Sequence, residues 1–138
     1  MLKNNEKFSG STVHIIEEEV DKGDIIAQSK VNISPFDTLR SLQKKIYQSE
    51  PDLVIKAINN IISGFEPTKQ DQDTSFDYFV PRTPDDSIID VNKPLIELIN
   101  DIRACDPDEY PAYFLYHGEK VCLKLWRPEK NNNEEEEL

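Results

Sequence analysis

The stretch STVHIIEEEVDKGDIIAQ, residues 11–28, places an acidic turn between two apolar runs. The run at 12–16 is rich in β-branched residues and apolar on both faces, which is typical of an interior strand. The run at 25–33 alternates in polarity and predicts a second strand. One face of that second strand would carry Ile25, Ala27, Ser29, Val31 and Ile33. The stretch therefore predicts a strand, an acidic turn and another strand, as parts of an α/β fold.

The acidic turn is the first candidate for a functional site. Its carboxylates are Glu17, Glu18, Glu19, Asp21 and Asp24. Asp21 stands beside Gly23 at the mouth of a strand, and catalytic residues of α/β folds commonly gather at strand ends. A carboxylate there can orient a histidine or a water and stabilise an imidazolium. The alternative is a solvated loop whose charges simply face water, and the spacing alone leaves both open.

Two helices and a hairpin are expected in the rest of the chain. Asp37 is predicted to cap the first helix, and Pro51 either to interrupt that helix or to start a new one. Gly64 is a natural end for it. The apolar stripe comprises Leu39, Leu42, Ile46, Leu53, Val54, Ala57, Ile58, Ile61 and Ile62.

A second helix is predicted after Asn92, which can cap it with Pro94 in its first turn. Residues 112–126 predict a β-hairpin whose turn contains Gly118. The apolar stripe of this helix would be Leu95, Leu98, Ile99 and Ile102, and Val121, Leu123 and Leu125 would share one face of the second hairpin strand.

The amino-acid composition argues against some classes of function, among them nucleic-acid binding and membrane spanning. The net charge is −11, of which residues 134–137 supply four negative charges, leaving −7 for the rest. Such a surface repels phosphate backbones and counts against nucleic-acid binding. Cys105 and Cys122 lie in apolar patterns without a CxxC, which favours buried, reduced thiols over a disulfide and suits a cytoplasmic protein. No apolar run is long enough to span a membrane, and the first residues do not resemble a secretory signal.

The ordered motifs also resemble a known family. SGSTVHIIEEEVDKGDIIAQ is similar to a segment of folate-dependent formyltransferases that reads G-x-T-V-H, an acidic loop, then D-x-G-x-I-I-x-Q. DTLRSLQKKI resembles the helix that follows there. PRTPDDSIID and LINDIRACDPDEYPAYFLYHGEKVCLKLWRPEK resemble the segment after the catalytic domain in methionyl-tRNA formyltransferase and sugar N-formyltransferases. The resemblance covers residues 3–130.

The resemblance implies transfer of a formyl group from 10-formyltetrahydrofolate to an amine, without a metal. In this family an Asn-His-Asp set serves the tetrahedral intermediate, and Asp21 matches its catalytic aspartate. The loop matches the segment whose backbone borders the pterin ring. The residues implied to bind the folate co-substrate are His14, Glu17, Glu18, Glu19, Val20 and Gly23. For His14, a structural hydrogen-bonding role remains an alternative.

The same resemblance implies a domain organisation. The fold would be the second half of a Rossmann-like formyltransferase domain, followed by a truncated helix-plus-hairpin region. The expected segments are 1–64, the later part of the catalytic domain; 65–80, a linker; 81–128, the start of the C-terminal domain; and 129–138, a disordered acidic tail.

The sequence differs from the family's motifs at several places, and these differences leave more than one function open. The family's catalytic asparagine and histidine precede the region matched here, and His117, in the hairpin turn, fits neither. Ile89-Asp90-Val91 replaces a frequent Ile-Asp-Trp. We therefore expect a truncated or split enzyme that is inactive alone and needs an N-terminal half or a homo-oligomer. An amino-sugar nucleotide is the favoured acceptor; a methionyl-tRNA formyltransferase-like fragment and a non-catalytic remnant or interaction module are the alternatives.

Overall fold

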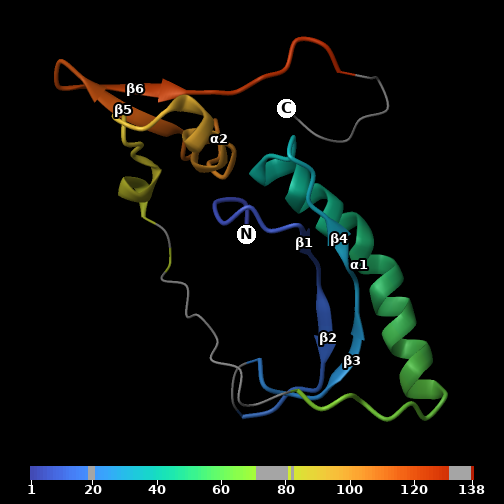
Figure 1. Cartoon of the computed structure of the whole chain (residues 1–138). Helices are drawn as coiled ribbons and strands as arrows, with labels where there is room; N and C mark the ends of the chain where they lie inside the picture. The colour runs from blue at the N-terminus through green and yellow to red at the C-terminus, as the bar shows by residue number, and fades with distance from the viewer. Residues whose placement is uncertain (19–20, 71–80, 82, 131–137) are drawn as a thin grey trace. The chain divides into compact units, whose positions relative to one another are not determined.

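The computed structural model describes residues 1–18, 21–70, 81, 83–130 and 138 (Figure 1). Its elements are β1 (Phe8–Ser9), β2 (Thr12–His14), β3 (Ile25–Gln28), β4 (Val31–Asn32), α1 (Leu39–Ile62), the 3-10 turn η1 (Pro84–Ser87), α2 (Leu95–Arg103), β5 (Ala112–Tyr116) and β6 (Glu119–Leu123). This mixture confirms the predicted α/β class.

The chain forms two compact units that are interleaved in sequence. Unit 1 comprises Met1–Lys7, Ile33–Lys44 and Val80–Leu138, and unit 2 comprises Phe8–Asn32 and Lys45–Phe79. The first residues of α1 belong to unit 1 and the remainder to unit 2. Each unit has its own small core.

The strands of unit 2 form two antiparallel pairs, β2 with β3 and β1 with β4. The first predicted strand, 12–16, ends at His14 in the structure, and its register against β3 shifts between Val13 and His14. The second predicted strand, 25–33, is wrong as one element. It divides because Ile25–Gln28 pairs with β2, whereas Val31–Asn32 pairs with β1.

β2 is not an interior strand among the described residues, where β3 is its one paired neighbour. The outer edge of β3 is extended by Thr68, which exchanges two backbone hydrogen bonds of 2.8 Å with Ile25. The beginning of the predicted linker therefore adds to this sheet. Residues 71–80 of that linker, and 131–137 of the predicted tail, lie outside the described residues.

α1 covers β2 and β3 with only part of its apolar surface. Leu53 and Ala57 are buried against Ala27 in the core of unit 2. The adjoining side of the helix is exposed, although it is also apolar at Tyr47, Val54, Ile55, Ile58, Ile61 and Ile62. The predicted apolar stripe of α1 therefore has a buried side, which packs on the strands, and an exposed side, which no described residue covers.

Pro51 lies inside α1 without ending it. Proline has no N–H to donate to the carbonyl of Tyr47, four residues earlier, so one helical hydrogen bond is absent. Pro51 is on the exposed side, where water can solvate that carbonyl. The predicted interruption is therefore wrong.

The start of α1 is capped by Thr38, one residue after the predicted cap. The Thr38 hydroxyl accepts the Ser41 N–H at 3.3 Å, and the Ser41 hydroxyl accepts the Thr38 N–H at 3.0 Å. Asp37 is fully buried and supports this cap, since its carboxylate accepts bonds from the Ser34 N–H and the Ser41 hydroxyl.

The core of unit 1 joins α2 to the β5–β6 hairpin. Its buried residues are Leu98, Ile102, Cys105 and Ala112, with Ile89, Leu123 and Leu125 packed against them. The hairpin prediction is confirmed, and its turn has positive φ at His117 and Gly118, as a type I′ turn requires.

Three details of unit 1 correct the sequence predictions. α2 is preceded by Pro94 as N-cap, because Asn92 instead bonds the Asp90 carboxylate in a local turn. Leu95 is exposed at the first turn of α2. Both cysteines are free, but only Cys105 is buried, since Cys122 lies on an exposed part of the hairpin.

An ion-pair cluster connects the first turn of α1 to the segment after α2. Arg40 donates to both carboxylate oxygens of Asp106, at 2.8 and 2.7 Å, and also to Asp108. These hydrogen bonds hold the pKa of Asp106 well below its ordinary value of 3.8. A carboxyl group whose pKa is lower in the folded state stabilises the folded protein fully at pH values above its unfolded-state pKa. That stabilisation is lost as the pH falls toward and through the folded-state pKa.

We expect Asp106→Asn to lower the stability of the protein at neutral pH, and the deficit to disappear as pH falls well below 3.8. The measurement is the urea midpoint of both proteins against pH at low salt. Asp52→Asn, an exposed change on α1, is the control and should show no such trend. A deficit that does not vary with pH would contradict the assignment.

Candidate functional site

The acidic turn between β2 and β3 is closed by backbone contacts around Gly23. The Ile15 N–H donates to the Asp24 carbonyl at 2.9 Å. Gly23 is buried, and a Cβ on it would lie 1.7 Å from the Ile15 oxygen and 3.2 Å from His14 Nδ1. Gln70 donates its side-chain amide to the Gly23 carbonyl at 2.7 Å. Only glycine allows this approach, so the turn depends on it.

The turn brings His14 and Asp21 together. His14 Nε2 lies 3.7 Å from Asp21 Oδ1, and His14 Nδ1 lies 2.8 Å from the Ile15 carbonyl. A carbonyl can only accept, so Nδ1 carries a proton in this arrangement. Nε2, the other ring nitrogen, faces the Asp21 carboxylate.

Asp21 is accessible to a ligand. Its side chain is 86% exposed, against 28% for His14. Its backbone is left-handed, with φ 59°, a conformation that aspartate and asparagine tolerate better than most residues. The left-handed backbone at Asp21 therefore places its exposed carboxylate near the half-buried side chain of His14.

The other predicted site residues have different surroundings. Glu17 and Glu18 are exposed on the turn, and Glu19 and Val20 lie outside the described residues. Immediately before them Ile16 is 91% exposed, an unusual position for a large apolar side chain. The turn thus offers an apolar surface beside carboxylates.

Two features of the site were missed from the sequence. Gln70 supports the turn from 47 positions away, and no local pattern distinguishes it from the other polar residues around it. The exposed Ile16 was assigned to a buried strand. Within the described ranges no cluster of residues suited to a metal ion occurs.

Comparison with known proteins finds similarity to formyltransferases. The sequence model of the Formyl transferase family matches residues 1–58. A 4-N formyltransferase from Francisella tularensis has a similar structure, with a TM-score of 0.67 and 28% identity over 90% of this chain. Residues 1–58 thus resemble the formyltransferase family in sequence, and the chain has the fold of solved formyltransferases.

Two further structures share the fold at lower identity. Methionyl-tRNA formyltransferase from Clostridium thermocellum matches 96% of this chain with a TM-score of 0.69 and 19% identity. HypX from Aquifex aeolicus, in complex with tetrahydrofolic acid, matches 88% with a TM-score of 0.68 and 21% identity. They support the fold predicted from the motifs.

The chain spans about half the length of the first two relatives. It covers 52% of the Francisella tularensis protein and 57% of the Clostridium thermocellum protein, but 21% of HypX. Among the described residues no helix is long and apolar enough to cross a membrane.

Gly23→Ala should open the turn between β2 and β3, because the alanine Cβ cannot coexist with the Ile15 carbonyl. We expect a loss of about 2 kcal/mol or more, as for other forced steric changes. Gly64→Ala is the control, since that position has positive φ but open space, and should cost about 1 kcal/mol. Urea denaturation gives the loss, and hydrogen exchange at the Ile15 amide locates it. An equal loss in both variants would show that the close approach does not constrain the turn.

Proposed function

We propose that the acidic turn is the folate-side part of a formyl-transfer site that moves a formyl group from 10-formyltetrahydrofolate to an amine. The observation that carries the proposal is the pairing of His14 with Asp21, 3.7 Å apart, on a turn within the residues that the family model matches. Asp21 is the proposed catalytic residue. The surrounding turn is proposed to contact the co-substrate.

The role of Asp21 follows from its charge and exposure. An amine that attacks a formyl carbon generates an oxyanion and must lose a proton. A carboxylate that is open to solvent can orient a histidine and help to move that proton. When bound, 10-formyltetrahydrofolate supplies the formyl carbon. The asparagine and histidine that the resemblance implies at the oxyanion would come from a segment not contained in the 138 residues.

The turn has features that suit a folate. A pterin is a flat ring with amide and amino donors, and it requires an apolar face and hydrogen-bond acceptors. Ile16 is almost fully exposed, and Glu17 and Glu18 are exposed residues whose backbone carbonyls are proposed as acceptors. A structure of similar fold, HypX from Aquifex aeolicus, is a complex with tetrahydrofolic acid. Glu19, Val20, His14 and Gly23 complete the proposed contact set.

An amino-sugar nucleotide is the proposed acceptor, and the cytoplasm the proposed location. The net charge of −11 disfavours a polyanion such as tRNA. Identity is also higher to the 4-N formyltransferase than to methionyl-tRNA formyltransferase, at 28% against 19%. The tRNA enzyme remains the second candidate, because its fold matches equally well.

The exposed face of α1 supports a requirement for a complementing segment. Val54, Ile58 and Ile61 fall on one side of the helix and are each about half or more exposed. An apolar surface of this kind marks an interaction site. We propose that the segment supplying the catalytic asparagine and histidine covers it; without that segment, a second copy of the chain would take its place.

Asp21→Asn should abolish most activity once a complementing half is supplied. Asparagine keeps the size and tolerates the left-handed backbone, so the turn should persist. It lacks the negative charge, and losing such a group costs on the order of 10² to 10⁴ in rate. Formyl transfer by the reconstituted pair is the measurement, beside folate affinity, which should change little.

Glu17→Gln and Glu18→Gln are matched controls, because each removes one charge from the same turn. Both should retain most of the rate, since backbone contacts are proposed there. A near-normal rate for Asp21→Asn, with activity lost in either glutamate variant, would contradict the assignment. Turnover by the chain alone would show that no complementing half is required.

The chain alone is expected to self-associate through the exposed face of α1. Ile58→Glu places a charge in the centre of that face and should weaken association about tenfold or more. Lys56→Glu introduces the same side chain at an exposed position on the opposite side of α1 and should not. Size-exclusion chromatography with light scattering measures the effect, and a stable compact monomer at all concentrations would contradict the proposal.

A further inference from the structure

The turn that carries Asp21 is held by a segment that follows α1 in the chain. Thr68 and Ile25 exchange two backbone hydrogen bonds of 2.8 Å, which makes them a hydrogen-bonded pair of an antiparallel ladder. In that register Gln70, two residues after Thr68, comes opposite Gly23, two residues before Ile25. The side-chain amide of Gln70 donates to the Gly23 carbonyl there, at 2.7 Å. A side chain therefore continues the pairing onto the turn itself.

Gly23 transmits this hold to the residues around it. It is buried, and a Cβ on it would lie 1.7 Å from the Ile15 oxygen and 3.2 Å from His14 Nδ1. The backbone of residue 23 is thus packed directly against the backbone and the ring that follow β2. Any displacement of Gly23 changes the spacing between the two sides of the turn, and Asp21 is two residues away on the same turn.

Asp21 depends on its backbone for its position. Its side chain is 86% exposed, so packing does not fix the carboxylate. Its φ of 59° lies in the left-handed region, and a residue other than glycine keeps such a conformation where the surrounding structure holds it. The hydrogen bond from Gln70 is a hold of this kind, because it joins the turn to a residue 47 positions away.

We infer that Gln70 is a positioning residue of the proposed formyl-transfer site. Its amide holds the Gly23 carbonyl, and the closed turn keeps Asp21 Oδ1 3.7 Å from His14 Nε2. The inference rests on the proposed function for what this pair does, but not for how the pair is held. Gln70 acts through the turn and is not assigned a contact with the co-substrate.

The test combines two substitutions in the full chain and is read from the nuclear magnetic resonance signals of the His14 ring. Asp21→Asn removes a charge beside the ring and should shift its signals. Gln70→Met keeps a similar side-chain length but cannot donate a hydrogen bond. In Gln70→Met the same Asp21→Asn change should shift the ring about half as much or less, because doubling a separation at least halves an electrostatic effect. Gln70→Lys restores a donor and should recover part of the shift.

Gln28→Met is the matched control. The Gln28 amide also forms a hydrogen bond between strands, to the Thr12 hydroxyl at 3.0 Å, at the end of the β2–β3 pair away from the turn. Its loss should leave the effect of Asp21→Asn on the His14 ring unchanged. An undiminished effect in Gln70→Met, or an equal reduction in Gln28→Met, would overturn the inference.

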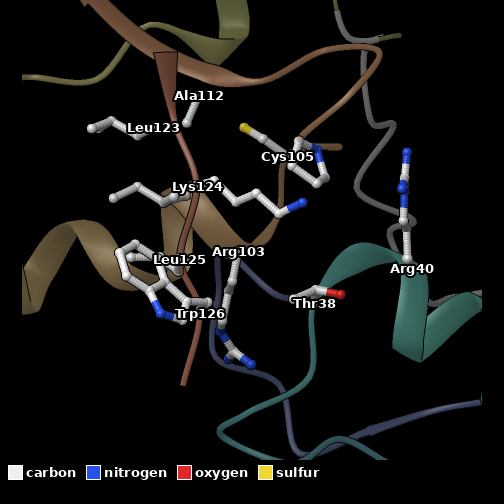
Figure 2. Close-up of a pocket in the computed structure, with 11 residues that line it drawn as sticks. Thr38, Arg40, Arg103, Cys105, Ala112, Leu123, Lys124, Leu125 and Trp126 are labelled. Atoms are coloured by element: carbon white, nitrogen blue, oxygen red, sulfur yellow. The ribbon is translucent and has the colours of Figure 1, made fainter. Parts of the chain in front are cut away.

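The buried residues of unit 1 provide an internal reference for folding. Arg103 and Cys105 line a cavity of about 230 Å³ within that unit (Figure 2), and both are buried. Because the turn belongs to unit 2, their amide signals should stay in place in all of these variants. Unchanged signals there show that a change at His14 comes from the turn and not from general unfolding.

Folate affinity then tests the link to the proposed function. Gln70→Met should bind 5-formyltetrahydrofolate about two- to tenfold more weakly than the unsubstituted chain, the effect of one lost hydrogen bond. An unchanged affinity would overturn the role of Gln70 in the site. No binding to the unsubstituted chain would contradict the proposed function alone, since the His14 ring signals still decide whether Gln70 positions Asp21.

Discussion

The turn between β2 and β3 can close only because residue 23 has no Cβ. The Ile15 carbonyl occupies the space that a side chain would need, and it also accepts a hydrogen bond from His14 Nδ1–H. The closed turn therefore engages Nδ1 of His14 in a hydrogen bond to the backbone and leaves Nε2 facing Asp21. The proposed chemistry of the site depends on this one steric constraint, since an open turn would separate the two side chains.

Unit 1 is organised around a buried charge. Arg103 crosses from α2 to the carbonyls of Ser34 and Asp37, just before the helix that Thr38 caps. The same residue therefore fixes the entry to α1. A buried guanidinium has a desolvation cost, and these hydrogen bonds partly offset it.

Local sequence patterns predicted which helices, strands and turns form, but not which strands pair with each other. The hairpin, α2 and the turn at residues 15–24 were predicted from alternation, helical periodicity and turn chemistry, which act over a few residues. The division of 25–33 could not be predicted, because it results from pairing with two different strands. In the candidate site, spacing and resemblance pointed to His14, Asp21 and Gly23, whose functional roles stay predictions. Gln70 could not be predicted, because its contact with Gly23 spans 47 positions.

The most direct test of the account is a nuclear magnetic resonance titration of the isotope-labelled chain with 5-formyltetrahydrofolate, a stable analogue of the proposed co-substrate. The account predicts saturable shifts concentrated in the amides of residues 14–18 and 21–24, and predicts that Gly23→Ala removes them. Saturable shifts confined to other residues, or none at millimolar ligand, would contradict the proposal that this turn is the folate side of a formyltransferase site.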